Sequence, residues 1–219
     1  MLSDLMDSWI PVALSQDLPA ATVMPVLAPA GPLALWRSRS GRATASADRC
    51  PHRGMRLSHG FVRGEALSCI YHGWSYSQAG TCLRIPAHPG LAPPETIRVA
   101  THPVAEAGGI IWVAVGEPAA EPPRLDGLVP LRSLTAEAEL STIEAAAGAT
   151  AGPDGLVWQA PNAPAVRLLL VPQRAGETLI HVLVPDGCAT SERIAASRAV
   201  ESLRRTAEER QRKGSRHAA

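Results

Sequence analysis

Two short stretches decide the fold class of this chain: CPHRG at residues 50–54 and CIYHGW at residues 69–74. Each carries one thiol and one imidazole, so Cys50, His52, Cys69 and His72 form a C-x-H pair followed by a C-x-x-H pair. Thiolate and imidazole are ligands that zinc and iron prefer. The four side chains are therefore predicted metal ligands, held on two turns that must meet in space.

The ligand set by itself leaves two kinds of centre open. A structural zinc site needs all four ligands on one ion, in tetrahedral geometry. A [2Fe–2S] cluster needs the ligands divided, with two thiolates on one iron and two imidazoles on the other, which is the Rieske arrangement. Neutral imidazoles leave such a cluster less negative than thiolates do, so it accepts an electron more easily.

The sequence around the four predicted ligands contains further motifs in a fixed order. After CPHRG come LSHG at 57–60, the second turn CIYHGW, Tyr76, the G-x-C of 80–82 and IPAHPG at 85–90. This order resembles the Rieske domain of the ring-hydroxylating and O-demethylating oxygenases. The resemblance implies one [2Fe–2S] cluster per chain, bound by Cys50, His52, Cys69 and His72. It also implies electron transfer, with a reductase and an electron acceptor as partners, and an oxygenase subunit as a further candidate.

The positions of the cysteines indicate which type of Rieske domain the sequence resembles. Respiratory-chain Rieske proteins carry an extra cysteine in each ligand loop, and the two form a disulfide. Here neither loop has a spare thiol, because the remaining cysteines, Cys82 and Cys188, lie elsewhere in the sequence. The domain therefore resembles the oxygenase type.

The length, composition and net charge of the chain argue against nucleic-acid binding and a membrane span. The chain has 219 residues, 46% of them hydrophobic, which is enough for one medium domain with an appendage. The net charge of +1 predicts no nucleic-acid surface. No apolar run reaches the roughly 18 residues that a membrane span needs, and the N-terminus lacks the basic region of a signal peptide. We therefore expect no membrane partner and a cytoplasmic location, where thiols stay reduced.

The pattern of elements predicts a mainly β protein. Short apolar runs broken by Gly, Pro, Asp and Ser indicate a β-sandwich or barrel over residues 5–118, the expected Rieske domain. A Pro-rich linker is predicted at 119–138, and a small α+β appendage at 139–213. The appendage is either a shortened remnant of an oxygenase second domain, as its order of elements allows, or an interaction module. The appendage is expected to end in a helix from about Ser191, followed by a flexible tail at 214–219.

Evidence for a second, catalytic iron is missing from the sequence. Oxygenases of this family hold a mononuclear iron on two histidines and a carboxylate. After His72 the histidines are His88, His102, His181 and His217, and no two lie four or five positions apart. We therefore predict no catalytic residues and no self-sufficient oxygenase. Two alternatives stay open: an oxygenase with an atypical or partner-supplied iron site, and a zinc-stabilised interaction domain.

Two surface features have competing interpretations. Arg53 and Arg56 flank the first ligand turn, where they either present positive charge to an acidic partner or are simply solvated. On the C-terminal helix, Ile194, Val200 and Leu203 can share one face. That stripe either joins copies into a homo-oligomer or packs on the chain's own sheet.

Overall fold

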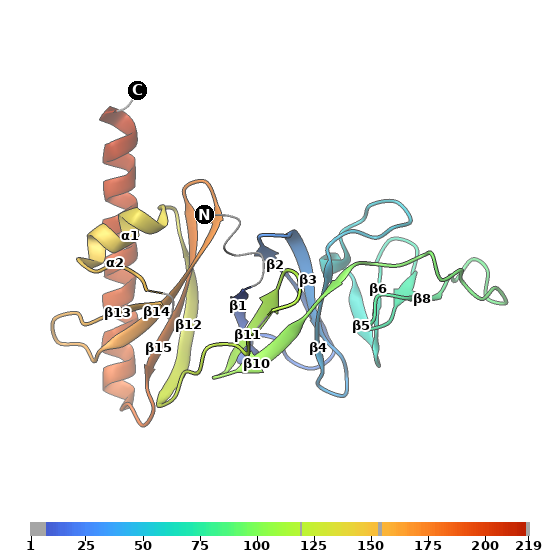
Figure 1. The fold of residues 1–219 in the computed structure, drawn as a ribbon, viewed down its shortest axis with the longest axis horizontal. Helices are drawn as coiled ribbons and strands as arrows, with labels where there is room; N and C mark the ends of the chain where they lie inside the picture. The colour runs from blue at the N-terminus through green and yellow to red at the C-terminus, as the bar shows by residue number, and fades with distance from the viewer. Residues whose placement is uncertain (1–7, 119, 153–154, 218–219) are drawn as a thin grey trace. The chain divides into compact units, whose positions relative to one another are not determined.

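The computed structural model of the chain describes residues 8–118, 120–152 and 155–217 (Figure 1). The chain divides into two compact units. The first runs up to Glu106 and includes Ile111–Pro122, and the second comprises Ala107–Ile110 and the residues from Pro123 onward. Within the described residues, none of the helices combines the length and apolar character needed to cross a membrane.

The first unit is built almost entirely from antiparallel strands, as the alternation of apolar runs and turn residues predicts. One sheet has the order β2-β3-β4-β9 and another the order β1-β11-β10. Their buried tryptophans are core residues, as expected: Trp36 is completely buried and Trp112 is 2% exposed. These strands are β1 (Trp9–Leu14), β2 (Thr22–Ala28), β3 (Gly31–Arg37), β4 (Ala43–Ala47), β9 (Thr101–His102), β10 (Val104–Ala107) and β11 (Ile110–Ala114).

A separate four-stranded sheet carries the second ligand turn between β6 and β7, whereas the first ligand turn follows β4 of the β2-β3-β4-β9 sheet. Its order is β5-β6-β7-β8, so each strand pairs with its neighbour in sequence. Short 3₁₀ helices lie at Ser15–Asp17 and, just before this sheet, at Leu57–His59. The strands are β5 (Phe61–Arg63), β6 (Ala66–Ser68), β7 (Ser75–Tyr76) and β8 (Cys82–Arg84).

The second unit is a four-stranded antiparallel sheet with the order β12-β15-β14-β13, together with two helices. The long helix α2 buries Ala196, Val200, Leu203 and Ala207, which recur at helical spacing and join the apolar core of this sheet. The elements are β12 (Leu128–Ala136), α1 (Leu140–Ala147), β13 (Leu156–Trp158), β14 (Val166–Arg174), β15 (Glu177–Pro185) and α2 (Thr190–His217).

The mainly β fold class is confirmed, but several predicted details are wrong. Strand β12 lies inside the stretch 119–138 that was expected to be linker, and residues 214–217 of the expected tail continue α2. Ile194 is 47% exposed and does not belong to the buried stripe of the helix. Of the predicted ranges, residues 5–7, 119, 153–154 and 218–219 lie outside the described residues. The limits of a Rieske domain at 5–118 and an appendage at 139–213 stay a prediction.

A proline inside β12 explains why the strand is hard to predict. Pro130 has no N–H to donate, and the pairing of β12 with β15 shifts register between Pro130 and Arg132. Strand β12 lies at an edge of its sheet, where such an irregularity is tolerated. The strand is held by its pairing with β15, which lies about 50 residues away in sequence and which the local sequence does not reveal.

Candidate iron–sulfur site

The two ligand turns have the same backbone construction. The N–H of Cys50 donates to the carbonyl of Met55 at 2.8 Å, and the N–H of Cys69 donates to the carbonyl of Trp74 at 2.9 Å. In each turn the glycine four residues after the cysteine donates back to the cysteine carbonyl, at 2.8 Å for Gly54 and 3.0 Å for Gly73. Both turns therefore close a loop of equal length around one thiol and one imidazole.

Glycine is needed at the closing position of each turn. Gly54 and Gly73 have φ of +73° and +70°, in the left-handed region that side chains rarely adopt. A Cβ on Gly73 would also lie 3.0 Å from Cγ of Pro86, which belongs to the neighbouring IPAHPG loop. A glycine four residues after each cysteine is the sequence signal for this repeated turn.

The two thiols lie together on the buried side of the site. Cys50 is 2% exposed and Cys69 is 1% exposed, and both join the apolar cluster that includes Trp36, Leu57 and Leu67. Burial raises the pKa of the Cys69 thiol, and the nearby Cys50 raises it further. Two thiols this close and this buried are suited to share one metal, which would compensate the charge of both thiolates.

The two imidazoles form the outer side of the site. The rings of His52 and His72 meet edge to face with centroids 4.6 Å apart. His72 is exposed, whereas His52 is partly covered by the ring of Trp74, which stacks on it at 4.4 Å with an interplanar angle of 3°. Burial, followed by the charges of His72 and Arg53, lowers the pKa of His52. The neutral imidazole that a metal requires is thereby favoured at His52.

An orphaned atom indicates that the site fits a metal group. Nδ1 of His52 is buried and has no hydrogen-bond partner, and a buried polar atom of this kind normally has one. A neutral imidazole nitrogen without a protein partner is available as a ligand. The donor set of two buried thiols beside two imidazoles that meet edge to face matches the divided ligation that a Rieske cluster requires.

Tyr76 contacts the thiol side of the site. Its hydroxyl lies 3.1 Å from Sγ of Cys50, and its side chain is 2% exposed. Burial, assisted by the hydrogen bond to Cys50, raises the pKa of the Tyr76 hydroxyl, so it keeps its proton. Because a metal-bound thiolate has no proton, the hydroxyl would be the donor in the loaded site.

The Asp48 carboxylate, just before the first ligand turn, is hydrogen-bonded to Ser58, just after it. Asp48, only 7% exposed, accepts hydrogen bonds from the backbone N–H of Ser58 at 2.7 Å and from its hydroxyl at 2.8 Å. The sequence indicated only a turn residue at this position. Asp48 joins the two ends of this turn by binding Ser58, ten residues further along the chain. Neither this contact nor the contact between Tyr76 and Cys50 could be predicted from the neighbouring residues in sequence.

The histidines that follow His72 in sequence belong to different elements. His88 is in the exposed loop after β8, and His102 pairs with Ala45 at the edge of its sheet. His181 is fully buried in β15, where Nδ1 lies 2.7 Å from the Ser133 hydroxyl. In the part of the chain that the structure describes, no group of three or more His, Cys, Asp or Glu side chains is arranged to hold a single metal ion.

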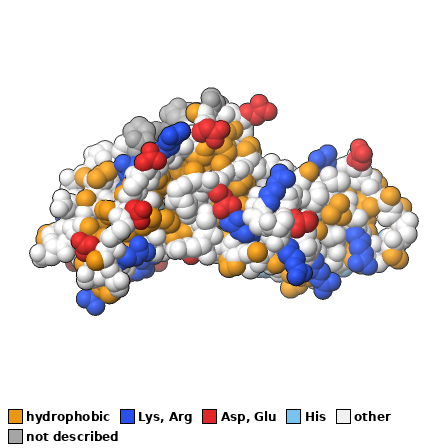
Figure 2. Space-filling view, turned by 90° about the horizontal axis from the view of Figure 1, so that it is seen from below, with side chains coloured by type: hydrophobic (Ala, Val, Ile, Leu, Met, Phe, Trp, Pro, Cys, Tyr) orange, Lys and Arg blue, Asp and Glu red, His pale blue; other side chains and the backbone are white. Residues whose placement is uncertain are grey.

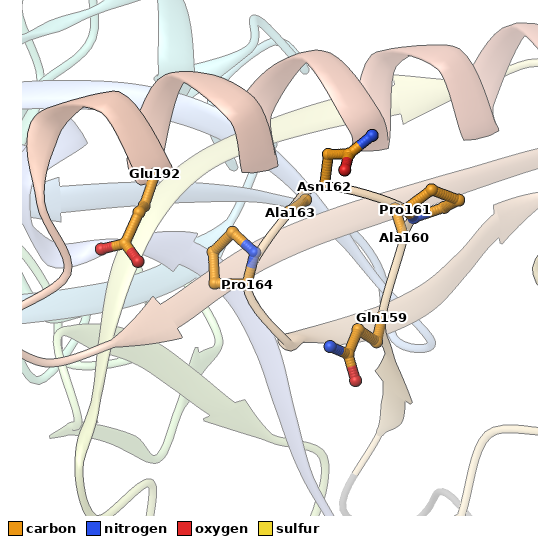
Figure 3. Close-up of a pocket in the computed structure, with 7 residues that line it drawn as sticks. All are labelled: Gln159, Ala160, Pro161, Asn162, Ala163, Pro164 and Glu192. Carbon is orange, nitrogen blue, oxygen red and sulfur yellow. The ribbon is translucent and has the colours of Figure 1, made fainter.

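A surface hollow in the second unit is unrelated to this chemistry. It has a volume of about 650 Å³ and lies between the loop that follows β13 and the first turn of α2 (Figure 3). Its lining offers one carboxylate, Glu192, and two side-chain amides, Gln159 and Asn162, but no thiol or imidazole. Nothing in this lining predicts a redox or metal function.

Comparison with known proteins agrees with the geometry. The family model "Rieske [2Fe-2S] domain" matches residues 8–103. Residues 8–103 are therefore a Rieske domain, and the expected cofactor, one [2Fe–2S] cluster per chain, is confirmed. A Rieske iron–sulfur electron-transfer role, of the kind found in oxygenase systems, follows for this domain.

The similar curated proteins are much longer than the matched segment. Oxidoreductase NdmD of Pseudomonas putida is 44% identical over 117 residues, which are 53% of this chain and 20% of that protein. The 3-chlorobenzoate-3,4-dioxygenase oxygenase subunit of Comamonas testosteroni is 37% identical over 124 residues, 55% of this chain and 29% of that protein. The chain thus spans less than a third of the length of these relatives.

Solved structures extend the likeness in fold to both units. Dicamba monooxygenase bound to dicamba has a TM-score of 0.74 at 19% identity, covering 96% of this chain and 89% of that one. Pseudomonas putida NdmA with caffeine, a QL mutant, has a TM-score of 0.72 at 18% identity, covering 94% and 82%. At this level of identity the match concerns the fold alone.

Proposed function

We propose that this chain carries one electron at a time through a [2Fe–2S] cluster, as a ferredoxin-like component or non-catalytic subunit of an oxygenase system. Cys50 and Cys69 would bind one iron, and His52 and His72 the other. The observation that carries the assignment is the separation of the ligands into a buried thiol pair and an outer imidazole pair. When bound, the cluster supplies one-electron chemistry at a potential above that of an all-cysteine cluster.

The residues around the cluster would control its access to water and the side from which an electron enters or leaves. The apolar cluster around Cys50 and Cys69 excludes water from the thiol side, and the Tyr76 hydroxyl donates to Cys50. Trp74 fixes the ring of His52 by stacking on it. His72 is left as the exposed ligand edge, which is the shortest way for an electron to leave or enter the site.

Metal analysis tests this function directly. We expect two irons and two acid-labile sulfides per chain, and an EPR signal only after reduction. Stoichiometric zinc without sulfide would overturn the proposal and favour the structural alternative. Replacing Cys69 with Ser should remove the cluster, since that thiolate then no longer binds iron.

A second candidate function is supported by the likeness in fold across both units. The neighbours that match this chain along nearly its full length include solved monooxygenases. Single turnover separates the candidates: the reduced protein is mixed with oxygen and a panel of aromatic and methoxylated compounds. Product, together with a third iron that is lost without bleaching the cluster, would show an oxygenase. No product and two irons per chain would support the carrier.

A further inference from the structure

Trp74 contacts both ligand turns at once. Its backbone carbonyl accepts the hydrogen bond from the N–H of Cys69 that closes the second turn, whereas its ring stacks on His52 of the first turn. The centroids of the two rings are 4.4 Å apart, and the ring planes are only 3° from parallel. A substitution at Trp74 keeps the backbone hydrogen bond and changes only the ring, so the effect of the ring can be measured by itself.

The two imidazoles have different aromatic neighbours. His52 lies against the ring of Trp74, which is itself half-buried and packs on the apolar cluster of the site. His72 is exposed, and its neighbour Tyr71 is 59% exposed and tilted by 35°. An aromatic ring attracts positive charge more strongly where water is excluded. The contact with the larger electrostatic effect is therefore the one between Trp74 and His52.

The face of an aromatic ring is the negative end of its quadrupole, and tryptophan attracts cations most strongly of the aromatic side chains. An imidazole bound to ferric iron shares part of the positive charge of the metal. The imidazole carries less positive charge after the iron has accepted an electron. A ring face stacked on this imidazole therefore stabilises the oxidised state more than the reduced state.

We propose that Trp74 is a positioning residue that acts through His52 to lower the reduction potential of the cluster. This inference rests on the proposed electron-carrier function and adds the residue that adjusts the driving force of the transfer. One electron enters or leaves the cluster, and no bond forms or breaks at Trp74. The ring itself gives up neither an electron nor a proton.

Positive side chains near the site act in the opposite direction. Arg53 is exposed and directly follows His52, and Figure 2 shows several blue side chains at the end of the molecule that carries β5 to β8. Positive charges favour the reduced cluster, because it is the more negative of the two states. These charges are the same in wild type and in every Trp74 variant, so a difference in potential between them reports the change at Trp74.

Redox titration at a single pH, followed by EPR, tests the proposal. Trp74→Leu should raise the equilibrium constant for reduction about tenfold, which corresponds to a potential about 59 mV higher. Trp74→Phe keeps a smaller ring with a weaker face and should raise that constant only about threefold. The matched control is Trp158→Leu, the same change at a half-buried tryptophan of β13 in the second unit, which should leave the potential unchanged.

A fluorinated tryptophan separates the effect of the ring face from the exclusion of water. Growth on this amino acid replaces all five tryptophans by rings of nearly the same shape with less electron density on their faces. The fluorinated wild type should have an equilibrium constant for reduction about twofold higher than the ordinary protein. Fluorination of the Trp74→Leu variant should cause no shift, which assigns the effect to Trp74 rather than to the other four.

The contrary results are equally definite. An unchanged or lower potential in an intact Trp74→Leu cluster overturns the proposal. So does a rise in this variant without a shift in the fluorinated wild type, because water reaching His52 would then explain the rise. If Trp74→Leu binds no cluster, Trp74→Phe and the fluorinated wild type decide the question. Iron and sulfide analysis and the EPR signal of the wild type test the electron-carrier function separately, so Trp74 can fail to affect the potential while that function stands.

Discussion

The hydrogen bond between Tyr76 and Cys50 should tune the reduction potential of the cluster. Tyr76→Phe removes the hydroxyl 3.1 Å from Sγ and keeps the ring, which is 2% exposed in the core, so packing is conserved. An added electron makes the sulfur more negative, so the hydrogen bond is stronger in the reduced state. Removing the bond should therefore make the cluster harder to reduce.

The size of the effect follows from the energy of such a bond. Hydrogen bonds to charged groups contribute about 1.5–3 kcal/mol. If about 1 kcal/mol of this is the difference between the two oxidation states, the potential of the Tyr76→Phe variant falls by about 40 mV, since 59 mV corresponds to a tenfold change for one electron.

The assay is a redox titration followed by EPR, with the Tyr71→Phe variant as control. Tyr71 is 59% exposed, and within the described residues its hydroxyl makes no hydrogen bond to a ligand thiol. Its loss should leave the potential unchanged. An unchanged or raised potential in an intact Tyr76→Phe cluster would refute the reasoning, because the hydroxyl would then not favour the reduced state.

Three further outcomes are expected. His72→Cys replaces a neutral ligand with an anionic one, so any cluster that survives should titrate at a lower potential; a higher potential would contradict the ligand assignment. Gly60→Ala would place a Cβ against the backbone oxygen of Ser68, beside Cys69, and should lower the free energy of unfolding of the unit by about 1–3 kcal/mol in urea. Gly90→Ala is the control: its Cβ would meet nothing within 4 Å and should have little effect on stability. The hydrogen bonds from Arg204, and then from Arg205, lower the pKa of Glu201 to about 2, so their stabilisation of α2 is present above about pH 4.5 and lost as pH falls toward 2. Helical circular dichroism of wild type and Arg204→Ala should therefore differ near neutral pH and converge in acid, and a constant difference would exclude this linkage.

The sequence was sufficient to predict the kind of site. Cys50, His52, Cys69 and His72 carry the chemistry in their residue types and spacing, because a metal ligand must be a particular side chain on a turn of particular length. The buried face of α2 was also readable, since its apolar residues repeat at helical period over several turns.

The tertiary structure alone decided which groups meet. Tyr76 of β7 reaches Cys50, 26 residues away, because both side chains pack in one buried cluster. Such a contact depends on tertiary packing, which the local sequence does not show. The same reason applies to β12, a Pro-containing segment that resembles a linker in sequence but becomes a strand by pairing with β15. Local pattern fixes what each residue can do, whereas long-range packing fixes its partner.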